Sequence, residues 1–335
     1  MFSLPDLKPI KEFRSIAILS SGGDSPGMNP AIRAIVRAAL NSGISQVYGI
    51  PRGYSGLINN DFHKLSSGSV TNIIQRGGTI LKSARCLEFK EPEFRANAAG
   101  ILRDRGIDAL IVIGGDGSMT GAHLFTEESG IPVIGLPGTI DNDIPGSDDT
   151  IGFDTAVNTA LEAIDKIRDT ASSHERLFLV EVMGRNSGFI ATQVGIACGA
   201  EMVVVPEYAF DLHELCVTLS ERRASGQGSS GIIVVAEGKD PGLTSRLAYQ
   251  LDELAQDPKI CILGHIQRGG SPSGHDRMLA SCLGAFAIKY LLAGYSDIMV
   301  GVKNGAVTDI PLRYVISNKK ILDRQIFDIA TLLHK

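Results

Sequence analysis

The sequence lacks several patterns that would point to particular classes of protein. No Cys-x-x-Cys pair occurs among its five cysteines, so the spacing supports neither a zinc knuckle nor a dithiol redox motif. No run of about 18 apolar residues occurs, and segment 1–14 lacks the apolar stretch of a signal peptide. The net charge of −5 leaves no basic surplus for nucleic acid or an anionic membrane. We therefore predict a cytoplasmic protein with reduced cysteines, whose partners are neither membranes nor nucleic acids.

Two common nucleotide-binding fingerprints are also missing. The glycine-rich segment 21–27 contains no Gly-Lys-Ser/Thr sequence of a P-loop and no Gly-x-Gly-x-x-Gly dinucleotide fingerprint. Hydrophobic residues make up 44% of the chain, which suits one or two globular α/β domains and argues against disorder. Glycine is abundant, with 38 in 335 residues against a usual share of about 7%. The excess gathers in three loops, which read SGGDSPG at 21–27, GGDGS at 114–118 and PGTIDND at 137–143.

Short apolar runs alternate with helical patterns along the chain. Runs rich in Val and Ile, without polar alternation, fit strands that are buried on both faces of a parallel sheet. Apolar stripes predict helices over 29–42, with Asn29 as N-cap and Pro30 at the first helical position, and over 155–170. The alternation predicts an open, doubly wound, mainly parallel α/β fold with ligands outside the C-terminal strand ends. The runs are Ile16–Leu19, Leu110–Ile113, Val133–Leu136, Phe178–Val182, Met202–Val205, Ile232–Val235, Ile260–Leu263 and Ile298–Val302.

Each glycine-rich loop follows an apolar run, and together the loops suit phosphoryl transfer. Glycine lets backbone N–H groups close on a phosphate, because no Cβ intervenes and φ can be positive. Asp116, at a predicted strand tip, can reach a Mg²⁺ ion that bridges nucleotide phosphates, and Ser118 can donate to a phosphate. Asp141 and Asp143 can point the same way, one to deprotonate a substrate hydroxyl and the other to order metal-bound water. Taken singly, each loop could instead be a tight or solvated turn after a strand.

Basic groups occur where a sugar phosphate would need them. Arg176, the turn at 183–185 and the run at 264–270 adjoin apolar runs, and arginine presents a planar fork suited to phosphate oxygens. A single arginine is more often a surface charge, and a single histidine such as His265 is more often buried and hydrogen-bonded. The sequence His-Ile-Gln-Arg-Gly-Gly is less easily explained in that way, and it favours an anionic ligand.

These segments carry a family resemblance. The chain resembles the bacterial ATP-dependent 6-phosphofructokinases from about Ile16 to its C-terminus. The resemblance implies two similar Rossmann-like domains, which we place at 1–152 plus 267–316 for ATP and at 153–266 plus 317–335 for fructose 6-phosphate. It also implies an allosteric, glycolytic homotetramer with shared sites, which uses Mg²⁺ and converts ATP and fructose 6-phosphate to ADP and fructose 1,6-bisphosphate. The carrying segments are SGGDSPGMN (21–29), GGTILKSAR (77–85), IGGDGS (113–118), GLPGTIDNDI (135–144), EVMGRNSG (181–188) and LGHIQRGGSP (263–272).

The resemblance further implies roles for individual residues. Asp141 would be the general base, Thr139 and Arg185 would stabilise the transferring phosphoryl group, and Asp116 would hold Mg²⁺. Residues implied for the ATP phosphates are Gly23, Arg85, Cys86, Gly115, Asp116, Gly117 and Ser118. Those implied for the sugar phosphate are Thr139, Asp141, Arg176, Met183, Gly184, Arg185, Glu237, Lys259, His265 and Arg268, with Arg176 reaching the 6-phosphate in a neighbouring subunit's site. Arg33, Arg37, Arg168 and Glu201 match the family's positions for the effectors ADP or phosphoenolpyruvate.

The chain departs from the family pattern in three places. Lys259 stands where the family usually has an arginine that binds the 6-phosphate; lysine keeps the charge but loses the bidentate fork. Ser67 replaces a family arginine of the effector site, and loop 226–231 has no lysine where the family often supplies one. Lys259 therefore predicts weaker affinity for the sugar phosphate, whereas the two effector-site differences predict altered or absent effector regulation. For Arg33 and Arg37, a solvated helix face with i,i+4 spacing is an equally good explanation.

Two glycines bear on the phosphoryl donor. Family members that use pyrophosphate tend to carry Asp in place of Gly117 and Lys in place of Gly138, where larger side chains would fill the space of an α-phosphate. Glycine at both positions therefore favours ATP. Alternative hypotheses are a pyrophosphate-dependent enzyme, a catalytically inactive sugar-phosphate or nucleotide sensor, and a lipid or NAD kinase that shares the Gly-Gly-Asp-Gly loop.

Overall fold

The computed structural model describes residues 2–174, 176–225, 230–238, 240, 242–254 and 257–333. The chain folds into two compact units, and each unit is built from separate stretches of sequence. The first unit comprises Met1–Thr155 and Arg268–Lys320, and the second comprises Ala156–Gln267 and Ile321–Lys335. The chain therefore leaves the first unit, builds most of the second, returns to complete the first, and ends in the second.

The first unit contains a seven-stranded sheet in the order β11-β10-β5-β4-β1-β2-β3. Its neighbouring strands run parallel, except that β3 and β11 pair antiparallel with their neighbours at the two edges. The strands are β1 (Ser15–Ser21), β2 (Gln46–Ile50), β3 (His63–Leu65), β4 (Ala109–Gly114), β5 (Val133–Pro137), β10 (Ile298–Lys303) and β11 (Ala306–Pro311).

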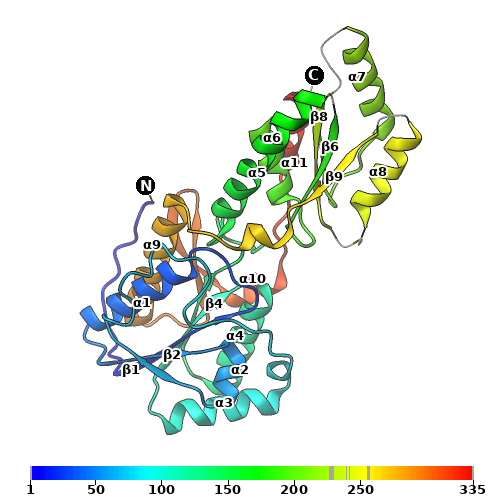
Figure 1. Ribbon diagram of the computed structural model, residues 1–335. Coiled ribbons are helices and arrows are strands. Elements are labelled where there is room, and N and C mark those ends of the chain that lie inside the picture. The colour runs from blue at the N-terminus through cyan, green and yellow to red at the C-terminus, as the bar shows by residue number, and fades with distance from the viewer. Residues whose placement is uncertain are drawn as a thin grey trace. The chain divides into compact units, whose positions relative to one another are not determined.

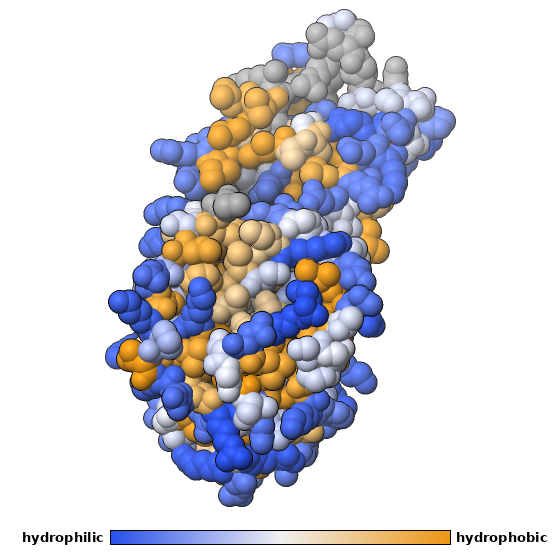
Figure 2. Space-filling view, turned by 90° about the vertical axis from the view of Figure 1, so that its left-hand side faces the viewer, coloured by the Kyte–Doolittle hydropathy of each residue, from blue (hydrophilic) through white to orange (hydrophobic). Residues whose placement is uncertain are grey.

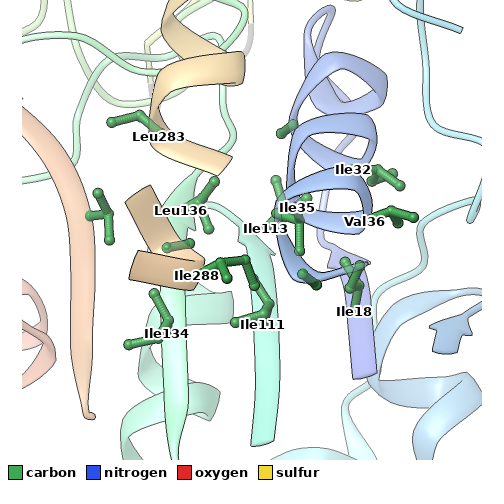
Figure 3. Packing of buried hydrophobic residues seen from close by; sticks show 14 of the residues in the cluster. Ile18, Ile32, Ile35, Val36, Ile111, Ile113, Ile134, Leu136, Leu283 and Ile288 are labelled. Atoms are coloured by element: carbon green, nitrogen blue, oxygen red, sulfur yellow. The ribbon is translucent and has the colours of Figure 1, made fainter. Parts of the chain in front are cut away.

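Helices cover both faces of this sheet (Figure 1). Along β1, Ile16 and Ile18 belong to the core that packs under α1 and α9, whereas Ala17 and Leu19 belong to the core on the opposite face. Figure 3 shows isoleucine and valine side chains of α1 beside isoleucines of β1 and β4. The alternation confirms that these apolar runs are strands buried on both faces. The helical elements are α1 (Met28–Asn41), α2 (Gly53–Ile58), η1 (Glu88–Lys90), α3 (Pro92–Asp104), α4 (Asp116–Ser129), α9 (Gly274–Leu292) and α10 (Leu312–Ser317).

The second unit contains a four-stranded, all-parallel sheet in the order β7-β8-β6-β9. The two units therefore confirm the predicted α/β fold with mainly parallel sheets. The strands are β6 (Leu177–Val182), β7 (Met202–Val204), β8 (Gly231–Ala236) and β9 (Lys259–Ile262). The helical elements are α5 (Phe153–His174), α6 (Phe189–Cys198), α7 (Leu212–Ala224), α8 (Leu243–Glu253), η2 (Gly264–Arg268) and α11 (Arg324–Leu333). Helix α5 begins in the first unit, and the last residue of η2 belongs to the first unit.

Two local predictions are wrong. Asn29 is not an N-cap: Gly27, with φ of 121°, precedes α1, and the Asn29 amide instead donates to the carbonyl oxygens of Arg76 and Gly77 at 3.0 and 3.2 Å. Strand β9 is not buried on both faces, because it forms the edge of its sheet with Ile260 42% and Ile262 60% exposed. Apolar residues also remain visible elsewhere on the surface (Figure 2).

Candidate active site

The three glycine-rich loops leave one edge of the sheet in the first unit. In the parallel register, Ser21 at the end of β1 is opposite Gly114 at the end of β4, and Gly114 is opposite Pro137 at the end of β5. The carboxyl ends of neighbouring parallel strands meet at the same edge, which is where ligands of open α/β sheets bind. All three loops therefore lie at the same edge of this sheet.

The GGDGS loop requires glycine at its first position. A Cβ on Gly114 would lie 2.5 Å from the Ser118 hydroxyl oxygen and 2.6 Å from the Ser21 carbonyl oxygen. Asp116, the first residue of α4, is exposed, whereas Ser118 is buried and its carbonyl oxygen accepts a 2.7 Å hydrogen bond from the Tyr54 hydroxyl. The first N–H groups of a helix have no intrahelical partner, so this turn can bind phosphate oxygens.

Gly117 and Gly138 lie in different surroundings. A Cβ on Gly117 would meet nothing within 4 Å, so the space beside it is open. A Cβ on Gly138 would lie 2.9 Å from the Ile113 side chain and 3.2 Å from that of Met28, so position 138 is closely packed. Gly117 therefore leaves room for a ligand at this edge of the sheet. Gly138 instead lets the third loop pack closely against the Ile113 and Met28 side chains.

The third loop holds its polar side chains below the surface. Thr139 is 7% exposed and Asp141 is 5% exposed, and the Asp141 N–H donates to the Thr139 hydroxyl oxygen at 3.2 Å. The Thr150 hydroxyl donates to the Thr139 carbonyl oxygen at 2.7 Å, which ties the start of the loop to its end. A buried carboxylate that stands next to a phosphate-binding turn is a candidate for abstracting a hydroxyl proton.

Segment 77–86 lies beside the first loop. The Gly22 N–H donates to the Ala84 carbonyl oxygen at 3.4 Å, which brings the exposed Arg85 and the half-buried Cys86 to the loop. Burial raises the pKa of the Cys86 thiol, which favours its protonated form. The Asn29 side chain accepts the Ile80 N–H at 2.7 Å and so fixes this segment against α1.

Arg268 also lies at the first loop. Its guanidinium donates to the Asp24 carbonyl oxygen at 3.2 Å, and a Cβ on Gly23 would come within 2.7 Å of the same nitrogen. The structure thus places Arg268 in the first unit, together with Gly23, although the motif that contains it begins in the second unit.

In the second unit, the turn 183–185 leaves the carboxyl end of β6. Gly184 has φ of 146°, and a Cβ there would lie 2.6 Å from the Ser187 carbonyl oxygen, so the turn requires glycine. The Arg185 N–H donates to the Glu237 carboxylate at 2.6 Å, and the Met183 N–H donates to the Gln267 amide oxygen at 2.8 Å. Gln267 is fully buried and had no predicted role.

A pocket of about 430 Å³ adjoins this turn. None of its lining residues had a predicted role, although Asn186 lies within the segment EVMGRNSG (181–188) that carries the family resemblance. The lining residues are Asn186, Val205, Pro206, Glu207, Tyr208, Phe210, Gly238, Asp240 and Leu243.

Arg176 and Lys259 lie at the opposite edge of the same sheet. Arg176 directly precedes β6, and Lys259 pairs with Phe178 at the start of β9. The Lys259 ammonium donates to Asp257 at 2.7 Å and holds the pKa of that carboxyl below its usual range, with a smaller contribution from Arg176. Strand β6 separates this pair from the turn 183–185, a length of about 20 Å at 3.3 Å per residue. One small ligand therefore cannot touch both groups within one chain.

The residues matched to an effector site are divided between the two units. Arg33 and Arg37 are half-buried on α1 of the first unit. In the second unit, Arg168 donates to the carbonyl oxygens of Cys198 and Gly199 at 2.6 and 3.2 Å, and Glu201 accepts the Ile232 N–H at 2.5 Å. Ser67 is exposed, and positions 226–229 of the lysine-free loop lie outside the described residues.

The groups around Asp116 suit Mg²⁺ better than a metal ion whose ligands all come from protein side chains. Within the described ranges, the one group of three potential metal ligands is His123, Glu127 and Asp297, and it does not include Asp116. A single exposed carboxylate beside a phosphate-binding turn suits Mg²⁺, which keeps waters and binds through one or two carboxylates plus substrate phosphates. Among the helices that the structure describes, none has the length and apolarity needed to cross a bilayer.

Comparison with known proteins gives a consistent result. The family model described as phosphofructokinase matches residues 15–291. The ATP-dependent 6-phosphofructokinase of Staphylococcus carnosus is 52% identical over 323 residues, which is 95% of this chain and 98% of that protein. The ATP-dependent 6-phosphofructokinase 1 of Thermus thermophilus is 51% identical over 96% of this chain and 99% of its own. A solved phosphofructokinase structure from Saccharomyces cerevisiae matches with a TM-score of 0.84 and 36% identity, over 96% of this chain and 48% of the yeast chain.

Proposed function

The chain belongs to the phosphofructokinase family, and on that premise we propose that it is a cytoplasmic, glycolytic enzyme that phosphorylates fructose 6-phosphate at its 1-hydroxyl with ATP. The proposal is supported most directly by the buried Asp141 on a loop that leaves the same sheet edge as the phosphate-binding turn of α4. The first unit would bind ATP, and the second would bind the sugar phosphate. Relatives that are about half identical over nearly their whole length carry the name of this activity.

The residues of the first unit divide the chemistry among them. The open turn at Gly115–Ser118, with Gly23 and Arg85, would hold the phosphates of ATP, and the open space beside Gly117 leaves room for a nucleotide. Magnesium, when bound with ATP, would neutralise phosphate charge, and Asp116 is the carboxylate that would hold it. Thr139 would donate a hydrogen bond to the transferring group.

Asp141 would accept the proton of the sugar 1-hydroxyl as that oxygen attacks the γ-phosphorus. The bond from the γ-phosphorus to the bridging oxygen of ADP breaks as the new phosphorus–oxygen bond forms, and the proton stays on the Asp141 carboxyl. Because such a transfer needs positioning and charge neutralisation more than covalent chemistry, a carboxylate that is fixed in place suffices.

The residues of the second unit would recognise the sugar phosphate. Met183, Gly184, Glu237 and His265 would contact the sugar, and Arg185 would stabilise the transferring phosphoryl group. Arg176 and Lys259 lie about 20 Å from this turn along β6, so we propose that they bind the 6-phosphate in the site of a neighbouring copy. The exposed apolar edge strand β9 supports an assembly, which we propose is a homotetramer with shared sites.

The first experiment is a comparison of initial rates with fructose 6-phosphate and Mg²⁺, with either ATP or pyrophosphate as donor. We expect turnover with ATP alone. Turnover with pyrophosphate alone would contradict the role given to Gly117, and turnover with neither would contradict the proposed activity and favour a sensor. Sedimentation of the purified protein tests the assembly, because a monomer that is active at assay concentration would exclude shared sites.

A further inference from the structure

Lys320 is the last residue of the first unit, and its side chain reaches back to the third loop. Its ammonium donates to the Asn142 amide oxygen at 2.9 Å and to the Asp148 carbonyl oxygen at 2.8 Å. These two partners lie 178 and 172 positions away in the sequence, so the contact joins two distant segments of the chain.

Asn142 stands between the two aspartates of the loop and is 6% exposed. Its φ of 51° is left-handed, a conformation that asparagine tolerates better than most residues. Its amide nitrogen donates to the Asp148 carbonyl oxygen at 3.1 Å, while its amide oxygen accepts from Lys320. Lys320, Asn142 and the Asp148 carbonyl thus form a closed triangle of hydrogen bonds.

This triangle is fixed to the sheet. The Asp148 N–H donates to the Val302 carbonyl oxygen at 2.7 Å, and its carboxylate accepts the Asn304 N–H at 2.6 Å. Val302 belongs to β10, and Asn304 lies in the turn that follows it. The lysine therefore connects the third loop (137–143) to β10 through hydrogen bonds that limit the freedom of the loop's backbone.

The charges around Lys320 explain why an ammonium is held there. Burial lowers the pKa of Lys320 to about 8, and the carboxylates of Asp149, Asp148 and Asp143 oppose that shift. Removing the cation would leave several carboxylates close together without its positive charge, and like charges at short range repel. An apolar replacement of the same length would therefore loosen the loop as well as remove two hydrogen bonds.

We propose that Lys320 is a positioning residue, which fixes the Asn142 side chain and thereby the backbone that carries Asp141. The inference rests on the proposed role of Asp141 as base. A displacement of about 1 Å between reacting groups can lower a rate by about 100-fold, so a loop freed at Asn142 would lose turnover more than substrate affinity.

The experiment compares Lys320→Met, Lys320→Arg and the matched control Lys319→Met, whose side chain is exposed at the neighbouring position. We expect Lys320→Met to lower kcat by roughly 10-fold to 100-fold with the KM for ATP changed less than about twofold. Lys320→Arg, which keeps a cation with several donors, should recover most of the loss, and Lys319→Met should match the wild type. A kcat for Lys320→Met within twofold of the wild type, or an equal loss in the control, would overturn the proposal.

A second variant covers the case in which Lys320→Met does not fold. Asn142→Gly keeps the left-handed backbone but removes the acceptor, so it should lower kcat in the same way. In the Asn142→Gly background, Lys320→Met should lower kcat by a smaller factor than it does alone, since both changes remove the same hydrogen bond between Lys320 and Asn142. Fully additive losses in that double mutant would contradict the triangle.

Amide hydrogen exchange separates this inference from the proposed activity. Lys320→Met, or Asn142→Gly in its place, should speed exchange in a peptide spanning 139–150 but not in one spanning α1. This readout needs no turnover, so it tests the anchor even if the wild type fails to use ATP. Unchanged exchange in 139–150 would overturn the positioning role, whereas an inactive wild type would overturn the proposed function.

Discussion

The third glycine-rich loop of the first unit (137–143) and the basic residues of the second unit are organised in opposite ways. In the loop, Thr139, Asp141 and Asn142 are all less than 8% exposed, and hydrogen bonds tie the loop to its own far end and to β10. In the second unit, Arg176 and Arg185 are exposed and lie at opposite ends of β6. Hydrogen bonds within the chain therefore fix the loop without a ligand, whereas the side chains of these two arginines are exposed to solvent.

The difference agrees with what each group would do under the proposed function. A general base must be held in a fixed position, because the rate of proton transfer changes when the reacting groups move by tenths of an ångström. A buried carboxylate also needs neighbouring groups that hold it in place. A phosphate-binding arginine can remain solvated until the ligand arrives, at a cost of about 0.5–1.5 kcal/mol for each side chain that is immobilised. Substitutions in the loop should thus act on kcat, and substitutions among the basic residues should act on KM.

Replacing Asp141, the proposed base, should have the largest effect. We expect Asp141→Asn to lower kcat by roughly 10²–10⁴-fold, because the amide has the shape of the carboxylate but cannot accept the proton. Initial rates at saturating substrates measure the loss, and Asp104→Asn at an exposed position at the end of α3 serves as control. Near-wild-type turnover of Asp141→Asn would remove this residue from the role of base.

Filling the open space at Gly117 should have an intermediate effect. We expect Gly117→Asp to lower kcat/KM for ATP by roughly 10-fold to 100-fold, because the new carboxylate would face nucleotide phosphates. The fold should persist, since the position is open and an acidic residue in the first turn of a helix is favourable. Gly117→Ala is the control and should change kcat/KM little; equal losses in both variants would indicate damage to the loop rather than repulsion of phosphate.

Restoring the family's usual residue at position 259 should have the smallest effect. We expect Lys259→Arg to lower the KM for fructose 6-phosphate by roughly twofold to fivefold, because a guanidinium can bind two phosphate oxygens at once. The present Lys259–Asp257 pair is solvent-exposed and contributes little to stability, so exchanging the cation should leave unfolding unchanged. The KM for ATP should also stay constant, and an unchanged KM for the sugar phosphate would count against a role for this position in binding it.

The sequence predicted the fold well because burial leaves a local trace. Strands β1 and β4 are buried along their whole length, and each therefore contains an unbroken run of apolar residues, Ile16–Leu19 in β1 and Ala109–Ile113 in β4. The same reasoning was wrong for β9, since a strand at a sheet edge can carry isoleucines that stay exposed. A short apolar run does not distinguish an edge strand from a central strand, because an edge strand can also be apolar where a second copy of the chain can cover it.

The site was predictable where glycine and acid follow a strand directly, and less so elsewhere. The roles of Asp116, Asp141 and the basic residues stay predictions, although the register does bring the loops of the first unit to one edge. Asn29 was assigned wrongly because Gly27 makes the turn itself, which frees the asparagine to hold segment 76–80. Lys320 could not be found in advance, because its partners lie more than 170 positions away.

The interleaved path of the chain sets the order in which the protein can be completed during translation. Strand β10, which lies next to β5 inside the first sheet, and α9, which packs against α1, are both encoded after nearly all of the second unit. When the ribosome has released β5, its future neighbour has not yet been made, and the edge stays open for more than 150 further residues. The second unit must fold while the first is incomplete, and a premature stop after residue 267 would leave the three glycine-rich loops on a sheet without two of its strands.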